Sequence, residues 1–218
     1  MPLTITRHGH SCVRVERDGR VLVVDPGTWS DLDAALDGAE AVLITHEHPD
    51  HVEVGAVADR VRAGVDVWAP GTVVADLEAA GAPRHRLHPV ADGDDLTVAG
   101  ARVRVLGERH EVIHPDLPVP ANVAYLVDDV LLHPGDSYTL PPAGTSVDVL
   151  LQPVGAPWLR LADAADYVRA VAPRTVVPIH DELLSERGRA GAVRLLRTLV
   201  PASELVVLAS GEPLRLPG

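Results

Sequence analysis

The chain has 218 residues, of which 46% are hydrophobic and 23% charged, an ordinary composition for a globular protein with a sizeable core. Its formal net charge is −12 and all nineteen basic residues are arginine, which argues against a surface for nucleic acid or an anionic membrane. No linker, low-complexity tract or short-period repeat divides the sequence, so we expect a single domain over residues 1–218.

The first segment is predicted to form three strands. Residues 3–6 alternate in polarity, and residues 11–16 and 20–24 form two runs joined by Asp18-Gly19, a strong hairpin signal. No apolar run is long enough to cross a bilayer and no signal-peptide pattern is visible, so we expect a cytoplasmic protein without membrane contact. The single cysteine, Cys12, excludes an internal disulfide and a cysteine-rich zinc site, and we expect a buried, inert thiol.

A dense polar segment follows the fourth predicted strand. Residues 41–44, Ala-Val-Leu-Ile, are typical of a buried strand, and residues 45–51 are Thr-His-Glu-His-Pro-Asp-His. Proteins of the α/β class place binding sites at the carboxyl ends of strands, and three histidines so close together are typical of a metal-binding tract. A solvated polar turn is the alternative interpretation.

The spacing within this segment suits two metal ions. His46 and His48 are two positions apart, so on an extended segment they point the same way and can bind one ion. Asp50 and His51 come after Pro49 has ended the extended run, so they can face a second ion. Imidazole and carboxylate together suit zinc, manganese or iron.

Here the chain resembles the metallo-β-lactamase-fold hydrolases, whose signature is H-x-H-x-D-H. His46, His48, Asp50 and His51 fill its fixed positions. The resemblance extends from residue 3 to about residue 180. It implies an α/β fold of four layers, an αββα sandwich in which two mixed sheets are flanked by helices.

The rest of the chain alternates between predicted strands and helices, as a layered fold requires. Apolar residues at helical spacing predict a helix from Val54 to Gly64, and a second helix that Thr72 caps. Asp181 is expected to cap the last helix. The other expected elements are strands at 65–69, 147–151, 175–179, 205–208 and 214–216, hairpins at 94–107 and 122–132, and helices at 161–172 and around Leu195.

Three of the later strands end in a polar residue that the resemblance assigns to the metal centre. These residues are His110, Asp136 and His180. His114 competes with His110, but the family places its ligand directly after the strand, so we expect His114 to line the substrate entrance. His85 and His88 have no Asp or third His near them in the sequence, and we expect both to be exposed.

The resemblance implies a dinuclear metal centre. Its ligands would be His46, His48 and His110 for the first ion, Asp50, His51 and His180 for the second, and Asp136 as a bridge. Three protein ligands and a bridge leave each ion room for solvent, as in catalytic sites. Asp50 is also expected to be catalytic, because it can orient a hydroxide or accept its proton. Zinc is the expected metal, and manganese or iron suit the same ligands.

Four other residues are open between two interpretations. Asp25 ends a strand where the family commonly has an Asp that supports the metal loop, but it is equally a turn residue. His10 lies in a Gly-His-Ser that lactonase-like and phosphodiesterase-like members share, and either it or, less expectedly, His8 faces the pocket unless the segment is a surface loop. Trp158 is either a wall of the substrate site or a core residue.

The resemblance implies a hydrolase that uses a metal-bridging hydroxide to cleave a small ester, lactone or phosphoester. The Gly-His-Ser makes the branch that contains ascorbate-6-phosphate lactonase the closest match, and a bridging Asp without a Cys ligand argues against a β-lactamase. The expected partner is a small-molecule substrate, which can be anionic because bound cations reverse the local charge, and the chain is either a monomer or a homo-oligomer. A di-iron redox protein or a non-catalytic metal-binding protein of the same fold is the alternative.

Overall fold

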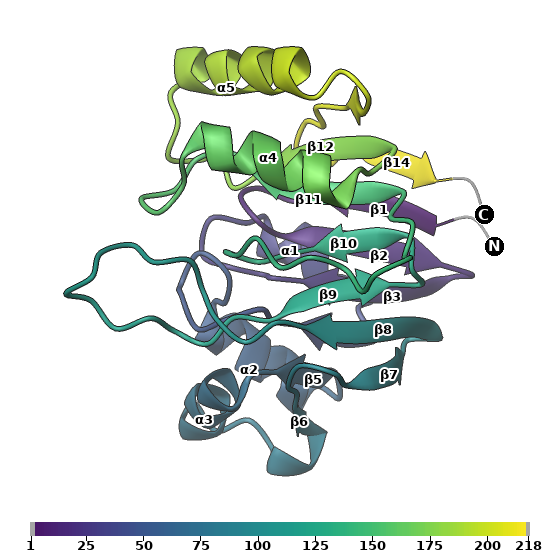
Figure 1. Ribbon diagram of the computed structural model, residues 1–218. Helices are drawn as coiled ribbons and strands as arrows, with labels where there is room; N and C mark the ends of the chain where they lie inside the picture. The colour runs from purple at the N-terminus through teal and green to yellow at the C-terminus, as the bar shows by residue number, and fades with distance from the viewer. Residues whose placement is uncertain (1–2, 217–218) are drawn as a thin grey trace.

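The computed structural model describes residues 3–216, which form two seven-stranded sheets packed face to face (Figure 1). In the first sheet the strand order is β14-β1-β2-β3-β4-β5-β6, and in the second it is β13-β12-β11-β10-β9-β8-β7. Both sheets are mixed, because β3 to β6 and β10 to β13 run parallel while their other neighbours are antiparallel. The predicted arrangement of two mixed sheets is confirmed.

The strands of the first sheet are β1 (Leu3–Arg7), β2 (Val13–Arg17), β3 (Arg20–Val24), β4 (Ala41–Leu43), β5 (Asp66–Ala69), β6 (Leu87–Pro89) and β14 (Pro213–Leu216). Those of the second are β7 (Asp95–Val98), β8 (Ala101–Leu106), β9 (Ala124–Val127), β10 (Leu131–His133), β11 (Val149–Pro153), β12 (Thr175–Ile179) and β13 (Glu204–Leu205). The helices are α1 (Leu32–Leu36), α2 (Val54–Arg62), α3 (Gly71–Ala79), α4 (Leu161–Val171) and α5 (Glu186–Leu199), with a 3₁₀ turn at Arg84–Arg86.

Three hydrophobic clusters separate four layers. The central cluster lies between the sheets, the second joins the first sheet to α1, α2 and α3, and the third joins the second sheet to α4 and α5. Strand β3 explains the continuous apolar runs, because Leu22 and Val24 face the central cluster while Val21 and Val23 face the helices. A strand buried on both faces has no solvated side on which polar residues could alternate. The αββα sandwich is therefore confirmed.

Three local predictions were wrong. Helix α3 begins at Gly71 after Pro70, and Thr72 does not cap it but donates a 3.0 Å hydrogen bond to Glu47. Helix α5 is capped by Ser185, whose hydroxyl accepts a hydrogen bond from the Gly188 N–H in the first turn. Asp181 instead forms ion pairs with Arg7 and Arg189. The closing strand predicted at 205–208 is only the two-residue β13. The sequence near the start of a helix does not show which of its polar residues will instead form hydrogen bonds or ion pairs with distant residues.

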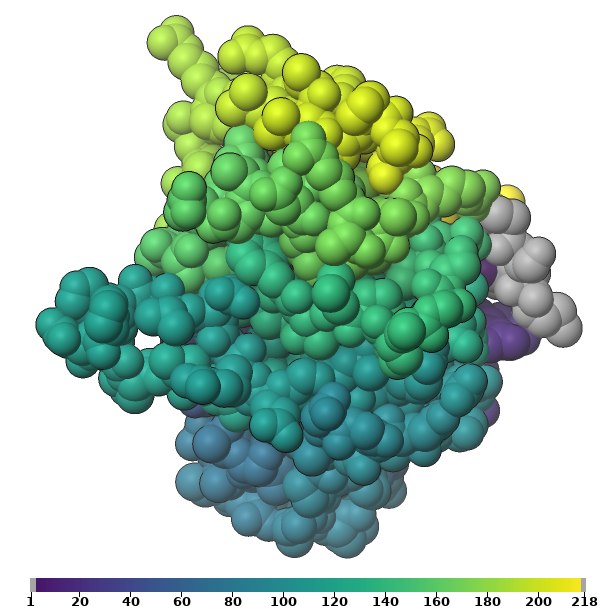
Figure 2. All heavy atoms as spheres, viewed as in Figure 1, coloured from purple at the N-terminus to yellow at the C-terminus, as the bar shows by residue number. Residues whose placement is uncertain are grey.

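The chain between β8 and β9 leaves the body of the molecule. Residues 112–118 of this segment are exposed, and Figure 2 shows it standing out beside the rest of the surface. Cys12 is buried, as expected. Across the described chain, no helix combines the length and apolar character that a bilayer crossing demands.

Candidate metal centre

The predicted ligands converge at one edge of the sandwich. They follow β4, β8, β10 and β12, and they fall into three groups in which one ligand atom per residue lies within 4.8 Å of the others. The groups are His46, His48, His110 and Asp136, then His51, Asp136 and His180, then His10, Asp50 and His180. All seven residues expected as ligands are present, and His10 joins them.

The loop after β4 is held by Asp25, which is fully buried and directly follows β3. Its carboxylate accepts hydrogen bonds from the Thr45 N–H at 2.8 Å, the Thr45 hydroxyl at 2.7 Å and His51 Nδ1 at 2.7 Å. Asp25 has φ of 51°, a conformation that the surrounding contacts must stabilise. The support interpretation of Asp25 is therefore the one that the structure favours.

Hydrogen bonds at Nδ1 determine which nitrogen of each imidazole is free. His51 donates from Nδ1 to Asp25, and His180 donates from Nδ1 to the Gly155 carbonyl at 2.8 Å. The Thr45 hydroxyl gives its proton to Asp25, so its oxygen accepts from His46 Nδ1 at 3.0 Å. His110 Nδ1 likewise faces the carbonyl of Glu111, the residue that follows it. In each of these rings the Nε2 lone pair is left for a metal ion.

Asp136 is the centre of the arrangement. Its Oδ1 lies 3.2 Å from His51 Nε2, and its Oδ2 lies 3.3 Å from His110 Nε2 and 3.2 Å from His180 Nε2. His46 Nε2 and His48 Nδ1 are 3.1 Å apart, and both rings pack edge-on against the ring of His110, at ring distances of 5.0 and 4.9 Å. A carboxylate in contact with three imidazoles that belong to two ligand groups has the position that a bridging ligand needs.

The chemistry of this donor set fits metal ions. His110 Nε2, His180 Nε2 and Asp136 Oδ1 are buried, and apart from the ion-pair contacts within the cluster they have no hydrogen-bond partner within residues 3–216. Buried polar atoms without a well-formed hydrogen bond cost free energy, and a bound cation would satisfy all three of these atoms. Nitrogen and carboxylate oxygen donors suit zinc, manganese and iron.

The electrostatics of the cluster point the same way. Burial alone would raise the pKa of Asp136, but the surrounding His51 and His180 imidazoles hold it well below its usual range. Burial alone would lower the pKa of these two histidines, but Asp136 raises that of His51 and brings that of His180 to about 9. The buried carboxylate of Asp136 is thus stabilised by positive charge around it, which metal ions bound to these imidazoles would supply.

The loop that carries Asp136 depends on Asn122, a residue the sequence reasoning missed. Buried Asn122 accepts the Asp136 N–H at 2.9 Å and donates to the Pro134 carbonyl at 3.0 Å. Gly135 has φ of +59°, and a Cβ there would lie 2.3 Å from Asn122 Oδ1. Trp158 donates from Nε1 to Asp136 Oδ2 at 2.8 Å. An Asn directly before an apolar strand was the available signal, but it is a common pattern in loops.

A second missed network supports the loop after β12. His180 has φ of +57°, and its N–H donates to the His10 carbonyl at 2.8 Å. Asp181 is buried and pairs with Arg7 from β1 and with Arg189 from α5 at 3.0 Å. Arg7 also donates to the Leu208 carbonyl at 3.1 Å. These ion pairs explain why Asp181 cannot cap α5.

The other histidines lie apart from the proposed ligands. His114 is 61% exposed in the projecting segment and lies 3.6 Å from Asp116. His88 is half-buried rather than exposed, stacks on Trp68 and lies 2.9 Å from Asp66, whereas His85 is exposed as expected. His8 is buried outside the three ligand groups.

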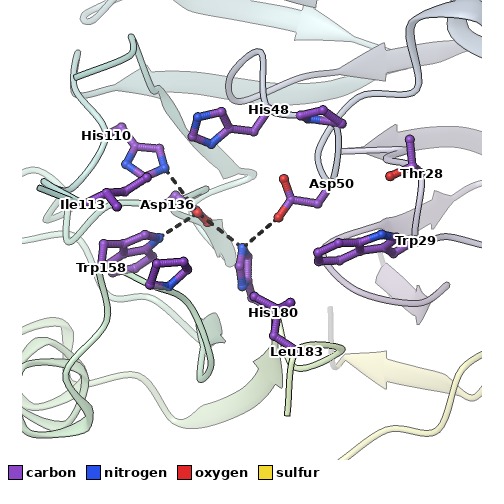
Figure 3. A pocket seen from close by; sticks show the side chains of 12 residues that line it. Thr28, Trp29, His48, Asp50, His110, Ile113, Asp136, Trp158, His180 and Leu183 are labelled. Carbon is purple, nitrogen blue, oxygen red and sulfur yellow. Dashed lines mark hydrogen bonds and ion pairs between the residues drawn. The ribbon is translucent and has the colours of Figure 1, made fainter. Parts of the chain in front are cut away.

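A cavity of about 400 Å³ lies over the centre. Figure 3 draws the side chains that line it. His110, Ile113 and Trp158 lie on one side, Thr28 and Trp29 on the other, and Asp50, Asp136 and His180 between them (Figure 3). Trp158 is therefore a cavity wall. The cavity is lined by Thr28, Trp29, His48, Pro49, Asp50, His110, Ile113, Asp136, Pro157, Trp158, His180 and Leu183.

Sequence comparison agrees with the fold and the motif. Residues 4–180 match the family described as "Beta-lactamase superfamily domain". Protein Rv0786c of Mycobacterium tuberculosis is 39% identical, with 86% of this chain and 88% of that protein aligned. A UPF0173 protein of Pyrococcus furiosus is 31% identical over 82% of this chain and 83% of its own. A UPF0173 metal-dependent hydrolase of Lysinibacillus sphaericus is 25% identical over 96% and 98%.

Solved structures show the same architecture. Igni18, a metallo hydrolase from Ignicoccus hospitalis, superposes with a TM-score of 0.76 at 21% identity over 100% of both chains. CmlA, a diiron β-hydroxylase from Streptomyces venezuelae, superposes with a TM-score of 0.70 at 19% identity over 98% of this chain and 54% of its own. At such identities the likeness concerns the fold.

The sandwich and its histidine–aspartate edge define a metal-dependent hydrolase of the metallo-β-lactamase fold. Within that class, the chain belongs to the beta-lactamase superfamily and to its UPF0173 metal-dependent hydrolase family.

Proposed function

We propose that this protein is a dinuclear metal-dependent hydrolase of a small ester, lactone or phosphoester. The observation that carries the proposal is the position of Asp136, whose two oxygens lie 3.2–3.3 Å from the Nε2 atoms of His51, His110 and His180. Two ions, zinc first and manganese or iron as alternatives, would lower the pKa of a water and polarise the bond to be cleaved.

The ligands divide into two sets around Asp136. His46, His48 and His110 would hold the first ion, and Asp50, His51 and His180 the second. Asp50 lines the cavity and its Oδ2 lies 3.4 Å from His180 Nε2. Because Asp50 is the carboxylate at the open side of the cluster, it is the group we assign to orient the attacking water and to accept its proton.

Within the hydrolase class we favour a carbonyl ester or lactone over a phosphoester, as in the lactonase-like branch. The support is the cavity lining, in which no arginine of the described chain takes part, so that no protein cation would meet the charge of a phosphoester. The substrate is a small molecule, because the cavity of about 400 Å³ is lined by side chains from a few loops.

A matched pair of variants tests the metal centre. In His110→Ala we expect loss of bound metal and of hydrolysis, whereas His114→Ala, four positions on and exposed, keeps both. Metal content, the rise in melting temperature on adding zinc or manganese, and turnover of lactone, ester and phosphodiester probes are measured on the same samples. Failure of the unmutated protein to bind any of these metals would refute the proposal.

A di-iron redox protein is the second candidate, because CmlA has the same fold. Oxygen consumption by the iron-loaded protein with an added electron donor, in a sample that hydrolyses none of the probes, would favour it. Hydrolysis by the zinc-loaded protein without oxygen uptake by the iron-loaded protein would exclude it.

A further inference from the structure

Apart from Thr28, the walls of the cavity are apolar wherever they are not proposed metal ligands. Five of the twelve lining residues are proposed ligands and one is Thr28. The remaining six are Trp29, Pro49, Ile113, Pro157, Trp158 and Leu183. The sequence contains no lysine, and among the described residues no arginine side chain lines the cavity, so a ligand there would meet positive charge at the metal ions.

Large apolar side chains are also exposed at the rim. Leu183 is 53% exposed, Trp29 43% and Ile113 38%. Trp29 packs edge-on against His10 at a ring distance of 4.8 Å, and Trp158 is held by its hydrogen bond to Asp136. Two positioned indoles thus stand on opposite sides of the cavity (Figure 3). Exposed apolar residues that rim a polar centre are typical of a ligand-binding site.

The one charged residue of the neighbouring hollow does not offer a cation either. Glu182 lines that hollow together with Trp29 and Leu183, and its carboxylate lies 3.7 Å from both Arg7 and Arg189, which are thereby paired. An anionic group remote from the bond to be cleaved would lose water against apolar walls without gaining a cation. An alkyl or aryl group in the same place would gain free energy in proportion to the apolar area that it removes from water.

We propose that the substrate is an ester or lactone with no second anionic group, whose alkyl or aryl part packs between Trp29 and Trp158 and against Ile113 and Leu183. This proposal rests on the proposed function. It changes the expectation of an anionic substrate, and it separates this chain from enzymes that act on phosphorylated lactones.

Three lactones of the same ring size test it: one without a side chain, one with a pentyl side chain, and one with a phosphate-bearing side chain. We expect kcat/KM for the pentyl lactone to exceed that of the other two by about tenfold. Leu183→Ser should lower kcat/KM for the pentyl lactone about fivefold, and lower it less for the unsubstituted lactone. Leu140→Ser is the matched control, because Leu140 is also 53% exposed but lies outside the cavity lining.

Preference for the phosphorylated lactone, or equal effects of Leu183→Ser and Leu140→Ser, would overturn this inference and leave the hydrolase intact. If no lactone or ester is cleaved, the proposed function fails instead. The pentyl lactam, which resists hydrolysis, then supplies an independent readout. Quenching of tryptophan fluorescence by the lactam, weakened in Leu183→Ser alone, would uphold the apolar site, and no quenching would refute it.

His10 differs from the proposed ligands His51 and His180 in its hydrogen bonds. Their Nδ1 atoms donate, whereas Nδ1 of His10 accepts. Its Nδ1 accepts the Glu182 N–H at 3.2 Å, so in the neutral ring the proton is on Nε2. That Nε2 lies 3.4 Å from Asp50 Oδ2, and the ring packs 3.8 Å from that of His180. A protonated nitrogen cannot bind a metal ion but can donate to a carboxylate.

We infer that His10 is a positioning residue, which donates a hydrogen bond to Asp50 and so determines which Asp50 oxygen faces the metal ion and the water. His10 is fully buried and is not among the cavity-lining residues, so it acts through Asp50 rather than on the substrate. The backbone contact of Glu182 fixes the tautomer that this role requires.

Two substitutions test this role. In His10→Leu we expect kcat to fall about 10- to 100-fold with KM nearly unchanged and metal content retained. In His10→Gln, whose amide can return an N–H near the Nε2 position, at least a tenth of the native kcat should remain. Loss of a metal ion from both variants would mean that His10 is a ligand, and equal kcat in the two variants would mean that it serves packing only.

Discussion

The two halves of the molecule contribute to the metal centre in different ways. The first sheet contributes His46, His48, Asp50 and His51 from a single loop after β4. The second sheet contributes one residue from each of three loops, after β8, β10 and β12. The first half is therefore a local motif on one support, and the second half is an assembly that exists only when the sheet has formed.

The supports differ in the same way. In the first half one buried residue, Asp25, accepts three hydrogen bonds from the ligand loop, two from Thr45 and one from His51. In the second half each residue has its own partner: the Glu111 carbonyl for His110, Asn122 for Asp136 and the Gly155 carbonyl for His180. Substitution of the supporting residue should therefore affect several ligands in the first half and only one ligand in the second half.

The largest effect is expected at the residue where the two halves meet. Asp136→Asn keeps the shape of the side chain but removes the negative charge that His51, His110 and His180 share. We expect loss of at least one bound ion and a fall in kcat/KM of about 10³-fold, which corresponds to several kcal/mol. Metal analysis and hydrolysis assays measure both. Asp116→Asn, at an 89% exposed carboxylate, is the control and should change neither.

Removal of the support in the first half should come next. Asp25→Ala leaves the Thr45 N–H, the Thr45 hydroxyl and His51 without their buried acceptor. We expect the free energy of unfolding of the metal-free protein to fall by about 3–5 kcal/mol, measured in urea. Affinity for both metal ions should fall about 10- to 100-fold, and an unchanged affinity would contradict the supporting role.

The corresponding change in the second half should be smaller. Asn122→Ala removes one acceptor and one donor from the Asp136 loop. The same urea experiment should give a loss of about 1–3 kcal/mol. Because His110 and His180 keep their own partners, metal affinity should fall less than in Asp25→Ala. An equal or larger fall would show that the two halves are supported alike.

The smallest effect is expected where neither half is touched. Gly191 lies within α5, and a Cβ there would meet no heavy atom within 4 Å. Gly191→Ala should raise the free energy of unfolding by about 0.5–1 kcal/mol, because alanine loses less backbone entropy on folding. Metal content and kcat should stay at the level of the unmutated protein. A change in either would show that α5 influences the metal centre.

Much of the fold could be predicted because the pattern of apolar residues along the chain indicates which segments are buried. The strands β3, β4, β11 and β12 are continuous apolar runs. Such runs are typical of strands that are covered on both faces of the sheet. The two-residue β13, the three-residue β6 and the five-residue α1 were missed or misjudged. Segments this short have too little periodicity, and their pairing with neighbours decides their structure.

By itself, the sequence determined the strand-and-loop layout and the cluster of donors in residues 45–51, because both depend on residue types at short spacing. Only the tertiary structure decided that His110 and not His114 approaches Asp136, that Asn122 and Arg7 support the loops, and that His10 is buried against Asp50. These contacts join residues from different strands and loops. Their distances follow from how the two sheets pack, which no short stretch of sequence specifies.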